Sequence, residues 1–191
     1  MNLLLIAVGA ALVNNVVLSQ CLGLCPFIGV SQKVETAAGM GGAVIFVMTI
    51  TSAVTSLINN FILKKLDIMF LQTIVFILVI AVLVGFIELF LKKMMPKLYA
   101  VLGEYLPSVT TNCAVLGIAL INVQKNYGFL ASVANGFGTA VGFAVAIVIM
   151  AGIREKIEYN NIPESFKGTP IVLVTAGLMA MAFFGFSGLI R

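Results

Sequence analysis

The chain has 191 residues, of which 61% are hydrophobic and only 9% are charged, and its mean hydropathy is +1.17. A soluble domain of this length needs far more charged surface, so the composition excludes a water-soluble protein and leaves the membrane as the solvent. The net charge of +4 therefore bears on membrane topology, and we expect no nucleic acid as a partner. Histidine is absent, which excludes histidine-ligated haem and Rieske-type ligation by this chain.

The apolar segments predict an all-α integral membrane fold. A transmembrane helix needs about 20 mostly apolar residues, and six segments meet this requirement. The first lacks the basic region of a signal peptide, so we expect it to be retained as a membrane helix. Short charged connections separate the segments, which predicts a single polytopic domain over residues 1–191. The predicted spans are 2–22, 37–60, 68–91, 98–122, 129–151 and 170–190.

The distribution of lysine and arginine over alternate loops predicts the orientation. With six spans, seven basic residues fall on one side of the membrane and four on the other. The positive-inside rule makes the first side cytoplasmic and places both termini on the outer side. The cytoplasmic set is Lys33, Lys92, Lys93, Lys97, Arg154, Lys156 and Lys167, and the outer set is Lys64, Lys65, Lys125 and Arg191.

Two halves of the chain share a pattern at an offset of 97 residues. "GMGGAV" at 39–44 and "GFGTAV" at 136–141 both read G-x-G-x-A-V, and Ile-Val pairs recur at 74–75 and 171–172. Three spans per half predict two inverted three-helix repeats, about 1–95 and 96–191, each with an interrupted first helix. In such repeats the interrupted helices meet near the bilayer midplane and form a site. The glycine patterns lie inside apolar spans, so we interpret them as close helix packing and not as a nucleotide motif.

Each interrupted helix carries a cysteine beside a break. In "LGLCPFIGVS" Cys25 precedes Pro26, which we expect to push Cys25 out of helical geometry. In "PSVTTNCAVLG" Cys113 follows a proline and several polar residues. An inverted repeat would bring both thiols together, where they could bind a metal or form a redox disulfide; otherwise they are small packing residues. Two cysteines cannot complete a four-thiolate iron–sulfur site, so the remaining ligands would come from another chain.

Further polar residues lie within the predicted spans. Cys21 has no counterpart in the second half, and we interpret it as a packing residue. Glu104 falls inside the fourth span, where it is either a functional carboxylate or, as we favour, an interfacial one. Amides and hydroxyls that precede the cysteines are costly in lipid, which indicates helix–helix hydrogen bonds or a structured polar pocket. They are Asn14, Asn15, Ser19, Gln20, Ser108, Thr110, Thr111 and Asn112.

Five stretches of the sequence together resemble a known family. They are "LVNNVVL", "LGLCPFIGVS", "TTNCAVLGIALIN", "GFGTAVGFAVAIVIMAGIREKI" and "VTAGLMAMAFFGFSGL". The chain resembles, over essentially its whole length, the A subunits of Rnf ion-translocating oxidoreductase complexes. A close sibling of that family is the E subunit of the sodium-pumping NADH:quinone oxidoreductase. "LGLCPF" and the compact length favour the Rnf member.

The resemblance implies a role in electron transfer across the bacterial cytoplasmic (inner) membrane. Cys25 and Cys113 would each ligate a 2Fe–2S cluster, which a paralogous E subunit of opposite orientation would complete. Such complexes pass electrons between ferredoxin and NAD⁺ and move Na⁺ or H⁺, with flavins and further iron–sulfur clusters held by other subunits. Two other functions fit the same residues: a secondary transporter with inverted repeats and no redox cofactor, and an assembly scaffold whose cysteines only pack.

Overall fold

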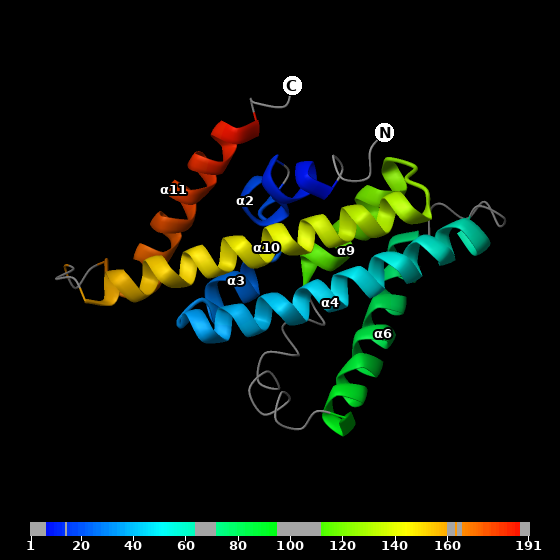
Figure 1. The fold of residues 1–191 in the computed structure, drawn as a ribbon, viewed down its shortest axis with the longest axis horizontal. Coiled ribbons are helices and arrows are strands. Elements are labelled where there is room, and N and C mark those ends of the chain that lie inside the picture. The colour runs from blue at the N-terminus through cyan, green and yellow to red at the C-terminus, as the bar shows by residue number, and fades with distance from the viewer. Residues whose placement is uncertain are drawn as a thin grey trace.

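The computed structural model describes residues 7–13, 15–63, 72–94, 112–159, 163 and 166–187, and contains no strand among them. Most of the described chain is helical (Figure 1). Two short segments, labelled η1 and η2, have the wider π-helical turn. In chain order the elements are η1 (Gly9–Val13), α2 (Val16–Gln20), α3 (Leu24–Val30), α4 (Val34–Ile58), η2 (Asn59–Leu63), α6 (Gln72–Met94), α9 (Cys113–Gln124), α10 (Phe129–Glu158) and α11 (Thr169–Ser187).

Helix α10 runs through the middle of the molecule and lies antiparallel beside α4 (Figure 1). Small residues let the two helices approach closely. A Cβ placed on Gly41 would lie 2.9 Å from the Cβ of Ala144, and one on Gly136 would overlap the side chain of Ser52. Both glycines belong to the G-x-G-x-A-V patterns, so the prediction that these patterns serve close packing is confirmed.

Helix α10 also packs directly against the main chain of the first segment, which comprises residues 7–13 and Asn15. Gly138 and Gly142 lie one turn apart on α10 and face the N-terminal segment. A Cβ on Gly138 would lie 2.7 Å from the Cα of Ala7, and one on Gly142 would lie 2.9 Å from the Cα of Ala11. Asn15 then donates from Nδ2 to the carbonyl oxygen of Gly142 at 2.9 Å. The first segment is therefore fixed on α10 by its main chain.

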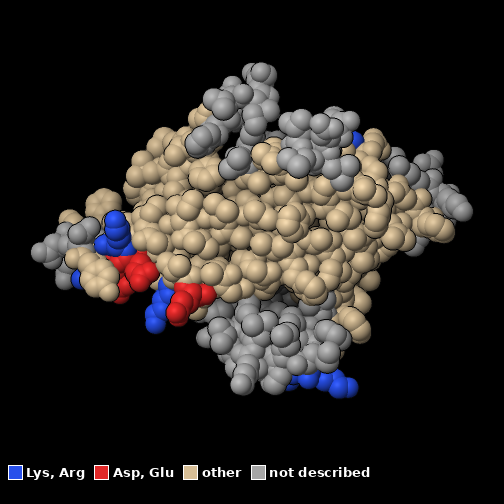
Figure 2. All heavy atoms as spheres, in the orientation of Figure 1, with Lys and Arg blue, Asp and Glu red and all other residues tan. Residues whose placement is uncertain are grey.

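Large apolar side chains cover much of the outer surface. Two stretches, Val34–Phe61 and Phe129–Glu158, are long and apolar enough to cross a membrane, and α6, α9 and α11 contain shorter apolar stretches. On the face drawn in Figure 2, charged side chains lie near helix ends and the described surface between them is uncharged. Water would be a poor solvent for such a surface, which fits a membrane protein. Exposed examples are Ile74, Leu78, Val82 and Phe86 of α6 and Leu173, Leu178 and Met181 of α11.

The first predicted span is interrupted, but not where proline suggested. A new helix begins after Asn15, and α2 ends at Gln20 with Cys21 as its C-cap, whose φ of 56° is left-handed. Gly23, with φ of 83°, precedes α3. Cys25 lies inside the first turn of α3, so the expectation that Pro26 would push it out of the helix was wrong. A first-turn residue has no intrahelical partner for its N–H, so proline is tolerated there.

The other predicted spans differ from the described helices mainly at their ends. The fourth span is described only from Asn112, and the part before it, with Glu104, lies outside the described residues. The fifth was predicted to end at 151, but α10 continues to Glu158 because "IREKIE" consists of good helix formers. The second, third and sixth predicted spans, 37–60, 68–91 and 170–190, correspond to α4 with η2, α6 and α11.

Helix starts in the two halves follow the offset of the sequence pattern. Helices α2 and α9 begin at Val16 and Cys113. These two starts are 97 residues apart, the same offset as the glycine patterns. Helices α4 and α10 begin 95 residues apart. The local structure therefore repeats along with the sequence.

Candidate functional site

The two predicted ligand cysteines occupy the starts of two helices. Cys25 lies in the first turn of α3, and Cys113 is the first residue of α9. Both thiols are free and exposed on the surface of the described chain. Cys21 is also free and exposed, at the left-handed end of α2. Exposure of Cys25 and Cys113 leaves both thiols accessible to a second protein chain.

Packing of the turn before α3 brings these helix starts together. A Cβ on Gly23 would lie 3.0 Å from Oδ1 of Asn112 and 3.2 Å from the Cβ of Ala114. One turn further along α9, the side chain of Leu22 fills the space where Gly117 has no side chain. Cys25 follows this turn by two residues, and Cys113 lies between Asn112 and Ala114. The two segments that carry the cysteines are therefore neighbours.

Asparagine caps the helix at corresponding positions of the two halves. Oδ1 of Asn15 accepts from the N–H of Val17 at 3.2 Å, and Oδ1 of Asn112 accepts from the N–H of Ala114 at 3.0 Å. Both asparagines have nearly the same extended backbone, with φ of −62° and −70° and ψ of 111° and 113°. These two caps are also 97 residues apart, a signal that the sequence comparison of the halves could have found.

The two caps differ at the nitrogen of the side-chain amide. Nδ2 of Asn15 donates to the carbonyl oxygen of Gly142. Nδ2 of Asn112 has no hydrogen-bond partner among the residues that the structure describes, although Asn112 is only 4% exposed. Buried polar groups are nearly always paired, so this N–H group is an exception that calls for an acceptor. It lies at the seam between the two segments that carry Cys25 and Cys113.

Arg154 of α10 holds the other end of α3. Its Nη1 donates to the carbonyl oxygen of Ile28 at 2.7 Å and to Oγ of Ser31 at 2.8 Å. Ser31 is fully buried, and α3 has only seven residues. A short helix has little stability of its own, so this contact and the Gly23 turn position Cys25. Sequence reasoning used Arg154 only for topology, because nothing local indicates a partner more than 120 residues away.

Replacing Arg154 with glutamine should therefore destabilise the protein. Loss of charge-assisted bonds to Ile28 and Ser31 costs about 1–3 kcal/mol, and each kcal/mol lowers the melting temperature of a chain this size by about 2–4 °C. Thermal unfolding of the purified protein in detergent measures the change. Lys156→Gln, at an exposed position of the same turn, is the matched control. Equal melting temperatures for the two variants would show that the Arg154 contacts contribute nothing.

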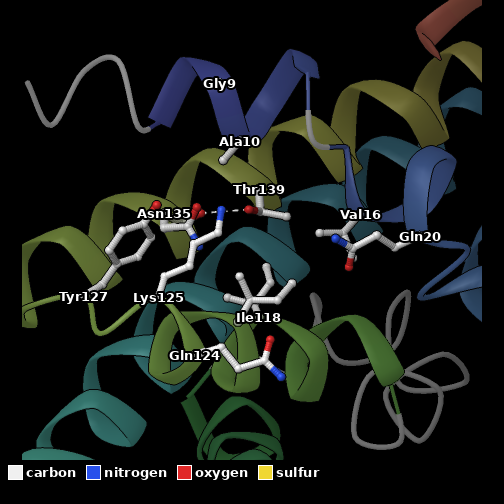
Figure 3. A pocket seen from close by; sticks show the side chains of 11 residues that line it. Gly9, Ala10, Val16, Gln20, Ile118, Gln124, Lys125, Tyr127, Asn135 and Thr139 are labelled. Carbon is white, nitrogen blue, oxygen red and sulfur yellow. Dashed lines mark hydrogen bonds between the residues drawn. The ribbon is translucent and has the colours of Figure 1, made fainter. Parts of the chain in front are cut away.

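A polar cavity lies between η1, α2, α9 and α10 (Figure 3). Its volume is about 360 Å³. On the α10 side, Thr139 donates to the carbonyl oxygen of Asn135 at 2.8 Å, and Nδ2 of Asn135 donates to Oδ1 of Asn122 at 2.7 Å. Gln20 lines the cavity as well, so the polar residues of the first span contribute both to helix caps and to a pocket. No cysteine or carboxylate is among its described lining residues.

The described residues contain no group of three or more histidine, cysteine, aspartate or glutamate side chains that could hold a metal ion. This described part of the chain instead offers two exposed thiols, and one amide N–H group without a partner in it, near the adjoining starts of α3 and α9. Thiolates are the protein ligands of iron–sulfur clusters, and N–H groups hydrogen-bond the cluster sulfurs. This donor set fits half of a cluster site. Asn14, Ser108, Thr110 and Thr111 lie outside the described residues.

Comparison with known proteins covers almost the entire chain. Residues 3–190 match the family described as Rnf-Nqr subunit, membrane protein. The chain is 56% identical over 189 residues to the A subunit of the Na⁺-translocating ferredoxin:NAD⁺ oxidoreductase complex of Acetobacterium woodii, covering 99% of this chain and 98% of the relative. It is 54% identical over 189 residues, 99% of this chain and 98% of the relative, to the A subunit of the ion-translocating oxidoreductase complex of Syntrophotalea carbinolica. The corresponding protein of Proteus mirabilis is 55% identical over 188 residues, with 98% and 97% covered.

Proposed function

Because this chain belongs to the Rnf-Nqr family of membrane subunits, we propose that it couples electron transfer between ferredoxin and NAD⁺ to translocation of Na⁺ or H⁺ within a multi-subunit complex. The relatives are named as subunits of ion-translocating oxidoreductase complexes, and one is named for ferredoxin, NAD⁺ and Na⁺. Identity of 54–56% over nearly the full length of both chains supports the proposal that this chain serves the same class of reaction as these relatives. The chain is thus one subunit of an enzyme, and we expect it to have no activity on its own.

Within that complex, Cys25 and Cys113 would supply half the ligands of a 2Fe–2S cluster. The observation that carries this proposal is the position of the two exposed thiols on adjoining helix starts, next to an unpaired buried N–H group. A second chain must add the other ligands, and a paralogous E subunit inserted in the opposite orientation has the required symmetry. When bound, such a cluster carries one electron at a time. The residues of this chain orient the thiols: the Gly23 turn and Arg154 hold α3, and Asn112 caps α9.

We further propose that the fold is a pair of inverted three-helix repeats over about 1–95 and 96–191. Two observations support this: the G-x-G-x-A-V patterns and the asparagine-capped starts of α2 and α9 both follow an offset of 97 residues. In inverted repeats the interrupted helices meet near the bilayer midplane. A redox centre there divides the roughly 30 Å of hydrocarbon into two shorter electron-transfer distances.

The charged ends of the helices support an orientation in the cytoplasmic (inner) membrane of bacteria. Lys33 precedes α4, Arg154 and Lys156 lie at the end of α10, and Lys167 precedes α11. Arg154 and Lys167 line one common cavity, so these ends lie together. Lys125 lies just before the opposite end of α10. The positive-inside rule makes the end with Lys33, Arg154, Lys156 and Lys167 cytoplasmic and places both termini outside.

Iron content and electron paramagnetic resonance (EPR) test the cluster directly. The chain is co-expressed with its paralogous E subunit, purified as a pair and reduced with dithionite. We expect about two irons per pair, as a 2Fe–2S cluster requires, and a signal that is lost in both Cys25→Ser and Cys113→Ser but kept in Cys21→Ser.

A correctly assembled pair that binds no iron would contradict the cluster proposal. The cysteines would then be packing residues. The polar cavity around Asn135 and Thr139 would become the leading site, as expected for a secondary transporter without a redox cofactor.

A further inference from the structure

We propose that Asn112 donates a hydrogen bond from Nδ2 to a sulfur of the cluster ligated at Cys25 and Cys113, and that this bond raises the reduction potential of the cluster. The inference rests on the proposed function. Asn112 would thus help to set the reduction potential, whereas the sequence alone identified it only as one of several polar residues before the cysteines.

The orientation of the Asn112 amide is fixed by its helix cap. Oδ1 accepts from the main-chain N–H of Ala114 at 3.0 Å, and only the oxygen of an amide can accept. The other end of the amide is therefore nitrogen, with two N–H donors. The cap holds the side chain in place at the first turn of α9, immediately before Cys113.

Burial makes an unpaired donor at this position costly. Asn112 is 4% exposed, and Nδ2 has no hydrogen-bond partner in the described part of the chain. The turn at Gly23 covers the amide from the side of α3, with a Cβ at Gly23 only 3.0 Å from Oδ1 of Asn112. A group that enters between the starts of α3 and α9 would supply the acceptor. The proposed cluster, bound by Cys25 and Cys113, would lie between these two helix starts.

The corresponding asparagine of the first half shows what a purely structural cap requires. Asn15 makes the same cap to Val17, and its Nδ2 is paired with the carbonyl oxygen of Gly142 at 2.9 Å. Of these two caps, only the one beside Cys113 has a nitrogen without a partner in the described chain. All polar groups of the Asn15 cap are therefore paired within the chain, whereas the Asn112 cap has an N–H donor available for a ligand.

A hydrogen bond to a cluster sulfur has a measurable electronic effect. Reduction adds negative charge to the cluster, and a hydrogen bond to a charged acceptor is stronger than one to a less charged acceptor. The reduced form is stabilised more than the oxidised form, so the potential rises. Hydrogen bonds to the sulfurs are among the factors that set iron–sulfur potentials.

Redox titration monitored by EPR on the co-purified pair tests this role. Asn112→Ser and Asn112→Asp both keep an oxygen that can cap α9, and both remove the amide donor. We expect the ratio of reduced to oxidised cluster at a fixed potential to fall about tenfold in each, which is a shift of about 59 mV for one electron. Asn15→Ser is the matched control, since it alters the same type of cap and should leave the potential unchanged.

A second measurement uses the unmodified protein. The pair is produced with asparagine labelled with ¹⁵N in the side-chain amide, and pulsed EPR of the reduced cluster should show a ¹⁵N coupling. An absent coupling, or equal potentials for wild type and both Asn112 variants, would overturn the role of Asn112 while the cluster itself stands. Absence of any iron signal that depends on Cys25 and Cys113 would instead overturn the proposed function.

Discussion

Replacing Cys25 or Cys113 with serine is expected to abolish ferredoxin-dependent reduction of NAD⁺ by membranes that contain the complex. Serine retains the size of cysteine but is not a soft thiolate ligand, so the shared cluster should not form. Without a carrier inside the membrane, an electron would have to cross about 30 Å of hydrocarbon in one step. The measurement is the rate of NADH formation with reduced ferredoxin in inverted membrane vesicles.

Cys21→Ser is the matched control, because Cys21 is also exposed and lies four residues before Cys25. Its activity should equal that of wild type. The same vesicles report ion transport, which we expect to stop together with electron transfer. Normal pumping by a cluster-free complex that carries both Cys25→Ala and Cys113→Ala would contradict the proposal that this site couples the two processes.

The second large effect is expected from Gly138→Ala. A Cβ at this position would overlap the carbonyl group of Ala7 and lie 2.7 Å from its Cα, so the main chain of the first segment must move. Overpacking against backbone costs about 1–3 kcal/mol. Displacement of the first segment from α10 also disturbs the bond between Asn15 and Gly142. We expect a melting temperature lower by several degrees and a reduced yield of assembled complex.

Gly152→Ala on the same helix is the control for this substitution. Nothing lies within 4 Å of a Cβ at Gly152, and alanine is favoured over glycine inside a helix by about 1 kcal/mol. The two substitutions should therefore change the melting temperature in opposite directions. If Gly138→Ala behaves like Gly152→Ala, the first segment does not rest on α10 by its main chain.

Helical structure and close packing could be predicted from the sequence because both depend on local composition. Long apolar runs predict the positions of α4, α6 and α11 within a few residues over the described chain, and they predict the start of α10 but not its end. The glycines at 41, 136 and 138 were correctly interpreted as packing residues, since small residues in apolar spans permit close approach. Family membership was also recognised from the motifs around Cys25 and Cys113, and the comparisons confirm it.

Tertiary contacts explain what the sequence did not reveal. Pro26 is compatible with either a break or a first helical turn, and the left-handed residues Cys21 and Gly23 place the break before α3. The contact of Arg154 with Ile28 joins residues 126 positions apart, and no local pattern announces such a pair. Asn112 could be recognised as a helix cap from its position, but its unpaired nitrogen is visible only once the neighbouring turn is in place.

Hydrogen bonds that join the N-terminal part of the chain to α10 also determine when, during synthesis, this part can reach its final position. Asn15 and Ile28 find their partners at Gly142 and Arg154, and these residues are synthesised more than 120 positions later. The segment that carries Cys25 therefore cannot reach its final position until the ribosome has completed α10. The cluster proposed at Cys25 and Cys113 would then form only after most of the chain has been translated.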